Sequence, residues 1–278
     1  MVDKIRRRVG VFLLFLLALA LGSLTTLFWI PEPEVGRGYF QMNALVILGL
    51  LGLAAAVVVL RPFEPYAGRP AGGWALLGAL LAGFLYWAAI WRERWTAARA
   101  AAAAATAACA GALALAAPAL VREVTPLPGR QWLLAAGLAS SALLLGWSLV
   151  TMLLGHWYLV SPRLTFRHLV AFCWALLGIA ALRAVVSGAA LVAAATVDAA
   201  VEPHPLRLLT SFSGEGMFFW FRWLWGILGT LVLAWMALHC ARRRANQSAT
   251  GILYVLVVGC FVGEILSLYL TATTGIPV

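Results

Sequence analysis

Three ionisable side chains interrupt the long apolar stretches of this sequence: Arg183, Arg222 and Glu264. A charged group is costly in lipid, so such residues usually face the interior of a helix bundle or a water-filled cavity. Arg222 lies about six residues inside one apolar stretch and Glu264 about seven residues before the end of the next, which at roughly 1.5 Å per residue puts both about 10 Å deep. Adjacent antiparallel helices would therefore pair them, and Arg183 enters the same layer if its helix extends beyond the bilayer.

The charges of these three residues suggest what they could bind. Two arginines against one glutamate leave one positive charge, and the planar guanidinium group binds carboxylates, phosphates or haem propionates through paired hydrogen bonds. Glu264 could instead carry a proton, if its arginine partner moves away. The structural alternative is a buried Arg222–Glu264 pair that only fixes helix packing, with Arg183 reaching toward the membrane surface or a backbone carbonyl.

An aromatic segment leads into this layer. Six of the eight residues from position 218 to position 225 are Phe or Trp. Tryptophan is enriched where a span meets the headgroup layer, so an interfacial belt is one interpretation. The other is a flat apolar slot for a quinone headgroup or a porphyrin, with Glu215 and Arg222 seven residues apart on one helix face. The candidate quinone or proton site comprises Arg183, Arg222, Glu264, Glu215, Trp220 and Trp223.

Three of the four histidines are predicted on the membrane side opposite the termini. Membrane cytochromes can hold haem iron between two histidines from different helices. His156 and His239 are the best candidate pair for haem b, with His168 as a substitute, and Arg242 and Arg243 could meet the propionates. The same histidines could bind copper or zinc, or simply form hydrogen bonds at the wet interface.

The composition requires a membrane for this chemistry. Of the 278 residues, 64% are hydrophobic and 11% are charged, whereas a soluble domain carries roughly 25% charged residues. This excludes a soluble enzyme, a disordered chain and a secreted disulfide scaffold. The net charge of +10 is spread over many loops, so it does not indicate nucleic-acid binding. The four cysteines show no CxxC spacing, which argues against zinc or iron–sulfur sites.

Eight apolar stretches are long enough to cross a bilayer as helices. They cover about 9–30, 44–60, 73–91, 98–121, 132–159, 166–197, 216–240 and 250–271. The runs show no period-2 alternation, so they are helices and not barrel strands. The first exceeds the roughly 7–15 apolar residues of a signal peptide, so we expect an uncleaved span. We expect one all-α transmembrane domain, residues 1–278, with the alanine-rich fourth span packed inside the bundle.

The orientation of this bundle is undecided by charge. Eight spans put both termini on one side, and the loops of each side carry nine Lys or Arg residues. The positive-inside rule therefore returns a tie. The basic first span favours termini in the cytoplasm, and we expect a multi-pass protein of a bacterial-type inner membrane.

These features give three functional hypotheses. The first is a membrane subunit of an electron-transfer complex that binds haem b, quinone or both and works with other subunits. The second is a transporter or channel for a small anionic or lipid-linked substrate. The third is a structural or assembly subunit without chemistry. The sequence has no P-loop, Rossmann glycine pattern, GxSxG or HExxH, so a self-sufficient ATPase or hydrolase is not expected.

Overall fold

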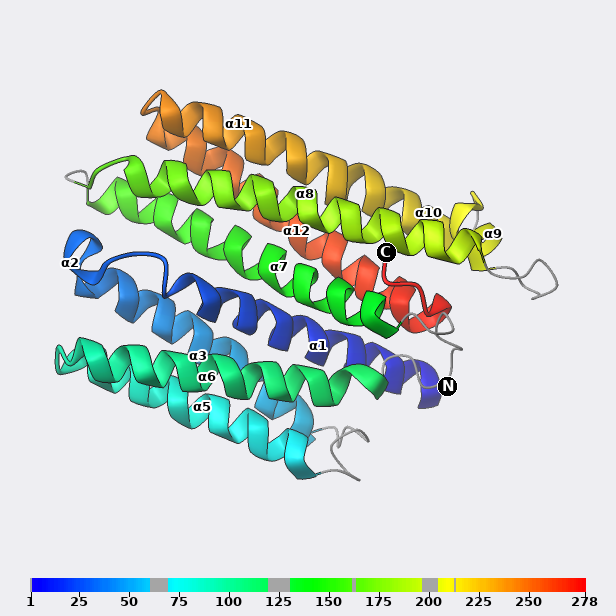
Figure 1. Cartoon of the computed structure of the whole chain (residues 1–278), viewed down its shortest axis with the longest axis horizontal. Helices are drawn as coiled ribbons and strands as arrows, with labels where there is room; N and C mark the ends of the chain where they lie inside the picture. The colour runs from blue at the N-terminus through cyan, green and yellow to red at the C-terminus, as the bar shows by residue number, and fades with distance from the viewer. Residues whose placement is uncertain (1, 61–69, 120–130, 162–163, 197–204, 213) are drawn as a thin grey trace.

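A computed structural model describes residues 2–60, 70–119, 131–161, 164–196, 205–212 and 214–278. Its eight spans run side by side along the long axis of the molecule (Figure 1). The first six are α1 (Val2–Thr26), α3 (Arg37–Leu60), α5 (Pro70–Trp91), α6 (Trp95–Ala116), α7 (Gln131–Val160) and α8 (Arg167–Ala195). The seventh joins α10 (Glu215–Phe221), η2 (Arg222–Gly229) and α11 (Thr230–Arg242), and the eighth is α12 (Asn246–Thr274). Short helices α2 (Glu32–Val35), η1 (Ala117–Ala119) and α9 (Pro205–Thr210) lie between spans.

This architecture confirms the predicted all-α membrane bundle. Eight helices are long and apolar enough to cross a membrane, and the described residues form no strand. A helix satisfies its own backbone hydrogen bonds, which lipid cannot do. Some boundaries differ from the prediction: α3 begins at Arg37 and not at 44, and α12 begins at Asn246 and not at 250. Helical hydrogen bonding continues into the polar residues at the membrane surface, where hydropathy no longer marks the helix.

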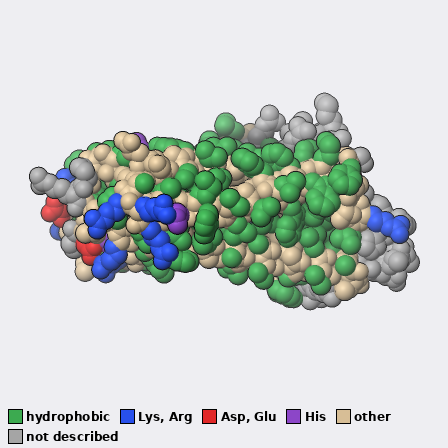
Figure 2. All heavy atoms as spheres, turned by 90° about the horizontal axis from the view of Figure 1, so that it is seen from above, with side chains coloured by type: hydrophobic (Ala, Val, Ile, Leu, Met, Phe, Trp, Pro, Cys, Tyr) green, Lys and Arg blue, Asp and Glu red, His purple; other side chains and the backbone are tan. Residues whose placement is uncertain are grey.

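The surface agrees with a lipid environment. Large apolar side chains such as Val59, Leu60 and Val185 are more than two thirds exposed. Figure 2 shows hydrophobic side chains along most of the face in view, with Lys and Arg gathered toward its two ends. An apolar girdle between charged ends is what a bilayer requires.

Helix α1 is the centre of the bundle. It lies between α7, α8, α11 and α12 on one side and α3, α5 and α6 on the other (Figure 1). Its closest neighbour is α7: a Cβ atom built on Gly22 would lie 1.8 Å from the Ala142 carbonyl oxygen, and one on Gly146 would lie 2.0 Å from the Gly22 carbonyl carbon. Only glycine lets the two backbones approach this closely.

The expectation that the alanine-rich span lies inside the bundle is wrong. In α6, 33% of the residues in the membrane-spanning stretch are buried, against 78% in α1. Helix α6 packs on α5 and α1 at the edge of the bundle. Small side chains here allow a tight α5–α6 pair and do not by themselves place a helix at the centre.

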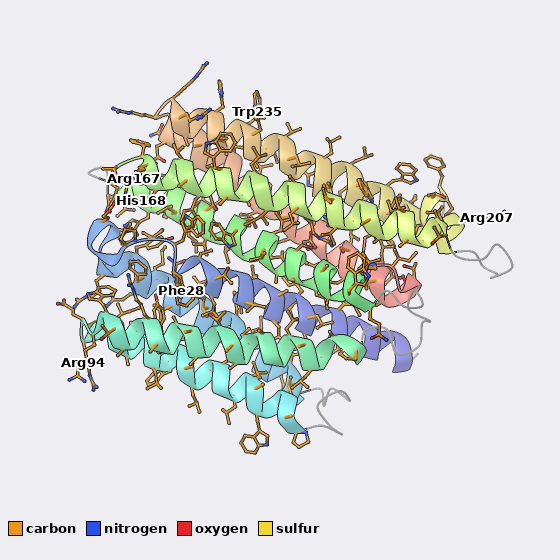
Figure 3. All side chains as sticks on the ribbon, in the orientation of Figure 1. Phe28, Arg94, Arg167, His168, Arg207 and Trp235 are labelled. Atoms are coloured by element: carbon orange, nitrogen blue, oxygen red, sulfur yellow. The ribbon has the colours of Figure 1, made fainter. Side chains whose placement is uncertain are left out.

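The two ends of the bundle differ in what they carry. Both chain termini lie toward the end that holds α9 (Figure 1). Arg94, Arg167 and His168 lie at the opposite end, and Arg207 lies at the end near the termini (Figure 3). This arrangement matches the even number of spans that the sequence predicts.

Candidate functional site

Arg183, Arg222 and Glu264 meet in the core of the bundle, as their predicted depths required. They come from α8, the first turn of η2 and α12, and each side chain is at most 2% exposed. Arg183 Nε lies 3.2 Å from Glu264 Oε1, and Arg183 Nη2 lies 3.2 Å from Oε2. Arg222 Nη2 donates to Oε1 at 2.7 Å. One carboxylate thus bridges two guanidinium groups, and these three residues are called the charge cluster below.

Arg183 is well supplied with further acceptors. Its Nη1 donates to Ser187 Oγ at 3.0 Å and its Nη2 to Ser267 Oγ at 2.6 Å. Its Nη2 also donates to the main-chain oxygen of Val278 at 3.1 Å. Sequence analysis missed both serines, although their spacing was a usable signal. Ser187 follows Arg183 by four residues and Ser267 follows Glu264 by three, the spacings at which helical side chains are neighbours.

Arg222 has far fewer hydrogen-bond acceptors than Arg183. Within the described part of the chain, its Nε and Nη1 atoms are buried and have no hydrogen-bond partner. The indole Nε1 of the next residue, Trp223, is buried and unpartnered as well. A buried donor without an acceptor costs roughly 1–3 kcal/mol, and more for a charged group. Such groups are rare in native structures and often mark a functional site or a missing ligand or water.

The helix around Arg222 is irregular. Residues Arg222–Gly229 form a π-helix between the α-helical segments α10 and α11. π-Helical turns are uncommon and occur frequently at functional sites. Here the turn passes close to α12: a Cβ atom on Gly263 would lie 2.6 Å from Gly226 Cα and 3.2 Å from Arg222 Nη1. The two glycines therefore make the space in which the Arg222 guanidinium group lies.

Two apolar pockets lie on the outer side of this helix pair. One, of about 590 Å³, is lined by residues that include Phe212, Phe221, Leu224 and Val262. The other, of about 420 Å³, lies against α1 and includes Val11, Phe12 and Tyr269. Phe218 and Leu266 line both pockets, so the two pockets adjoin each other, and together they are called the aromatic groove below. Of its lining residues, Phe221 directly precedes Arg222 and Ile265 directly follows Glu264, whereas Arg222 and Glu264 themselves are not among them.

The other residues predicted for this site, Trp220, Trp223 and Glu215, do not belong to the charge cluster. Trp220 is 36% exposed, stacks on Phe212 and lines the larger pocket. Trp223 packs against a small buried cluster that contains Phe219 and Val278. Glu215 is the first residue of α10, and its side chain lies outside the part of the chain that the structure describes. The predicted polar stripe from Glu215 to Arg222 therefore stays a prediction.

The three histidines proposed as ligands lie far from the charge cluster along their helices, at the end opposite the termini, and the fourth, His204, lies outside the described residues. His156 is exposed on α7 and shares a hydrogen bond of 3.1 Å with the hydroxyl group of Tyr254. His239 is exposed on α11 and stacks on Trp235 of the same helix. His168 is buried and bonds through Nε2 to the Glu34 carboxylate. Each ring thus has its own partner, and the predicted haem pair is neither shown nor contradicted.

The arginines that were expected to meet haem propionates lie close to His239. Arg242 lies over the Trp174 ring, with its guanidinium carbon 5.1 Å from the ring centroid, and Arg243 is exposed. Among the described residues, no group of three or more His, Cys, Asp or Glu side chains is placed to hold a metal ion. A copper or zinc site with three such ligands is therefore absent from the described part of the chain.

No protein-family model matches this sequence, and a comparison with curated proteins found no match. Any inference about function therefore rests on the chemistry of the charge cluster and its surroundings. A buried arginine with two free N–H groups can donate to a carbonyl, carboxylate or phosphate oxygen. The carboxylate of Glu264 can exchange a proton if an arginine is drawn away from it.

Proposed function

We propose that the chain is a membrane subunit of an electron-transfer complex and binds a quinone-class molecule at Arg222. The observation that carries this proposal is the pair of buried, unpartnered N–H groups on Arg222, beside a carboxylate and behind an aromatic groove. A quinone needs each of these features: a donor for its carbonyl oxygen, a group that exchanges protons, and apolar space for its ring and tail.

The chemistry assigned to each residue follows from its position. Arg222 donates from Nε and Nη1 to a quinone carbonyl oxygen, which satisfies two donors that the protein leaves open. When Arg222 donates to the reduced quinone, its interaction with the Glu264 carboxylate weakens. The carboxylate can then take up a proton as the quinone is reduced. Arg183 keeps Glu264 in place through its own hydrogen bonds. Electrons come from another subunit or from haem b at His156 and His239, in a bacterial-type inner membrane.

Quinone titration of the purified protein tests the proposal. Decylubiquinone added to the detergent-solubilised protein should quench the fluorescence of nearby tryptophans in a saturable way. Arg222→Gln should weaken binding by about tenfold or more, because a hydrogen bond from a charged donor is worth roughly 1.5–3 kcal/mol. Arg37→Gln is the matched control, since Arg37 lies at the other end of the bundle in an exposed pair with Glu93. Unsaturable quenching, or equal affinity in Arg222→Gln, would reject the proposal.

A second candidate is transport of a lipid-linked acid. It is favoured by the two arginine side chains that share one carboxylate, and by the main-chain oxygen that Arg183 already holds. An anionic headgroup would bind to Arg222 as a charge-assisted acceptor. Decyl phosphate as a competitor distinguishes the two. Transport is the better explanation if two results are found. Decyl phosphate must displace decylubiquinone at a lower concentration than decylubiquinone itself requires to bind, and it must enter vesicles that contain the unmodified protein but not vesicles that contain Arg222→Gln.

The haem hypothesis has a separate test. A reduced-minus-oxidised spectrum of the protein, expressed with ample haem, should show a b-type α-band if His156 and His239 ligate iron. The band should vanish in His156→Ala and in His239→Ala, and should survive in His168→Ala. A flat spectrum would assign electron supply to another subunit. It would leave quinone binding at Arg222 unaffected.

A structural or assembly role remains the third candidate. It predicts that the charge cluster only joins helices α8 and α12 to the seventh span. In that case Arg222→Gln would lower the stability of the protein or its association with other subunits, and neither decylubiquinone nor decyl phosphate would bind. The ligand titration above therefore decides among all three.

A further inference from the structure

A small cavity lies beside the charge cluster, against Arg183. It measures about 10 Å³ and is lined by residues of α7, α8, α12 and the segment after α12. The polar members of its lining are Ser141, Arg183, Ser267 and Thr271. Pro277 closes it on one side and packs against Gly137, where a built Cβ atom would lie 2.8 Å from Pro277 Cβ. This is about the size that one water molecule needs.

One lining side chain lacks a partner. Ser141 Oγ is buried, with 2% of the residue exposed, and has no hydrogen-bond partner among the described residues. The neighbouring serines of α7 differ, since Ser140 Oγ donates to the Ala136 carbonyl oxygen at 2.7 Å and Ser148 Oγ to the Leu145 carbonyl oxygen at 2.8 Å. Ser141 Oγ thus makes no hydrogen bond at normal distance, and the nearby Glu264 carboxylate is the acceptor toward which its proton can turn. Its oxygen is free to accept a hydrogen bond from a further group.

The hydroxyl groups on the other side of the cavity have acceptor capacity left. Ser267 Oγ accepts one hydrogen bond from Arg183 Nη2 and donates its own proton to the main-chain oxygen of Val278. Thr271 Oγ1 donates toward the main-chain oxygens of Ser267 and Ile276. Each hydroxyl oxygen has two lone pairs, so a water molecule can donate to either of them. The cavity therefore offers the two to four polar partners that an ordered internal water requires.

We propose that this cavity holds one ordered water molecule, which donates one hydrogen bond to the Ser141 oxygen and the other to the hydroxyl oxygen of Ser267 or Thr271. Empty cavities of native proteins are apolar, whereas polar cavities of this size are filled. The water completes the hydrogen bonding of Ser141 and links α7 to the charge cluster through α12.

The position of Ser141 gives this water a role in proton exchange, an extension that rests on the proposed function. Ser141 lies close to Glu264, whose other charged or titratable neighbours are Arg183, Arg222 and, one turn away on α12, Cys260. A proton can pass from the water to the Ser141 oxygen as the Ser141 proton passes to Glu264. A proton from solvent then restores the water. The route reaches Glu264 through Ser141 and does not pass through Arg222.

A high-resolution structure of the protein in nanodiscs tests the water without any ligand. We expect density within hydrogen-bond distance of Ser141 Oγ in the unmodified protein and no such density in Ser141→Val, where a methyl group fills the space. Ser140→Ala is the matched control and should keep the density, because Ser140 bonds only to carbonyl groups of its own helix. An empty cavity in a map that resolves other core waters would overturn the proposal. So would density that persists unchanged in Ser141→Val.

Infrared spectroscopy tests the proton route separately. The C=O band of protonated Glu264, absent in Glu264→Gln, should rise after a jump to acid pH. In Ser141→Ala this rise should slow by at least about tenfold, which corresponds to about 1.4 kcal/mol of barrier. Ser140→Ala should match the unmodified protein. Equal rates in all three proteins would reject the route, even where the water is present. Neither measurement uses a quinone, so a failure of quinone binding is distinguishable from a failure here.

Discussion

Arg222 and Glu264 are joined by a single hydrogen bond of 2.7 Å, although both side chains are fully buried. Arg183 contacts the same carboxylate from the other side through both Nε and Nη2. The cluster is therefore asymmetric: one arginine is fixed by several acceptors, and the other has donors to spare. This asymmetry leaves Arg222 with unused hydrogen-bond donors, which is the basis of the quinone proposal.

Removing the carboxylate should be the most damaging single change in the cluster. Glu264→Gln leaves two buried guanidinium groups without a counter-charge, and breaking a buried ion pair in this way costs about 3–5 kcal/mol. Denaturant unfolding of the detergent-solubilised protein measures the loss. Glu93→Gln is the matched control, because Glu93 pairs with Arg37 at the surface, where its side chain is 68% exposed. Equal stabilities of the two variants would show that the cluster does not hold the helices together.

Lysine substitutions should separate the two arginines. Lysine keeps the charge but loses the planar fork. Arg183→Lys cannot reach Ser187, Ser267 and Glu264 together, so it should lower the free energy of unfolding by about 2–3 kcal/mol, at roughly 1 kcal/mol per lost hydrogen bond. Arg222→Lys loses one hydrogen bond, the one to Glu264, and should cost about 1 kcal/mol or less at the same rate. The same unfolding assay applies, and a larger loss for Arg222→Lys would contradict the asymmetry described above.

The close contact between Gly226 and Gly263 predicts opposite signs for two glycine substitutions on α12. Gly263→Ala places a methyl group 2.6 Å from Gly226 Cα, so it must push the seventh span away or displace Arg222. Overpacking of this kind costs about 1–3 kcal/mol. Gly251→Ala has open space around it and should stabilise the helix by about 0.5–1 kcal/mol. If Gly263→Ala were as stable as Gly251→Ala, the η2–α12 contact would be wider than the structure indicates.

Much of this fold could be predicted from the sequence because the membrane restricts the choices. Length and hydropathy locate all eight spans, since lipid permits only helices or closed barrels. The meeting of Arg222 with Glu264 follows from equal depth on consecutive helices. Arg183 follows from the length of α8, which continues to Ala195 and so places Arg183 well inside the span.

Other features depend on side-chain packing that hydropathy does not report. The central position of α1 rests on the fit of Gly22 against α7, and no pattern in either helix alone shows it. The π-helix at Arg222 is irregular because its backbone fits around the neighbouring α12, a tertiary effect. The return of residues 275–278 into the core depends on the left-handed Gly275 (φ 73°) and on acceptors that Arg183 needs. Each of these requires two distant segments to be considered together.

The structure predicts which loop positions share a side of the membrane, and labelling of those positions can decide the orientation that the count of Lys and Arg residues leaves open. Arg94 and Arg167 lie at one end of the bundle and Arg207 at the other (Figure 3), so cysteines at the first two positions should react with a membrane-impermeant maleimide from one side only. A cysteine at position 207 should react only from the opposite side. The native cysteines Cys109, Cys173, Cys240 and Cys260 are first replaced, although three of them are buried. In membrane vesicles of known orientation the two classes of site should show complementary labelling. The direction of that labelling decides which half of the membrane holds the charge cluster. Reaction of positions 94 and 207 from the same side would mean an even number of spans between them, whereas the structure places three there, α6, α7 and α8. It would require a different arrangement of the helices that hold Arg183, Arg222 and Glu264.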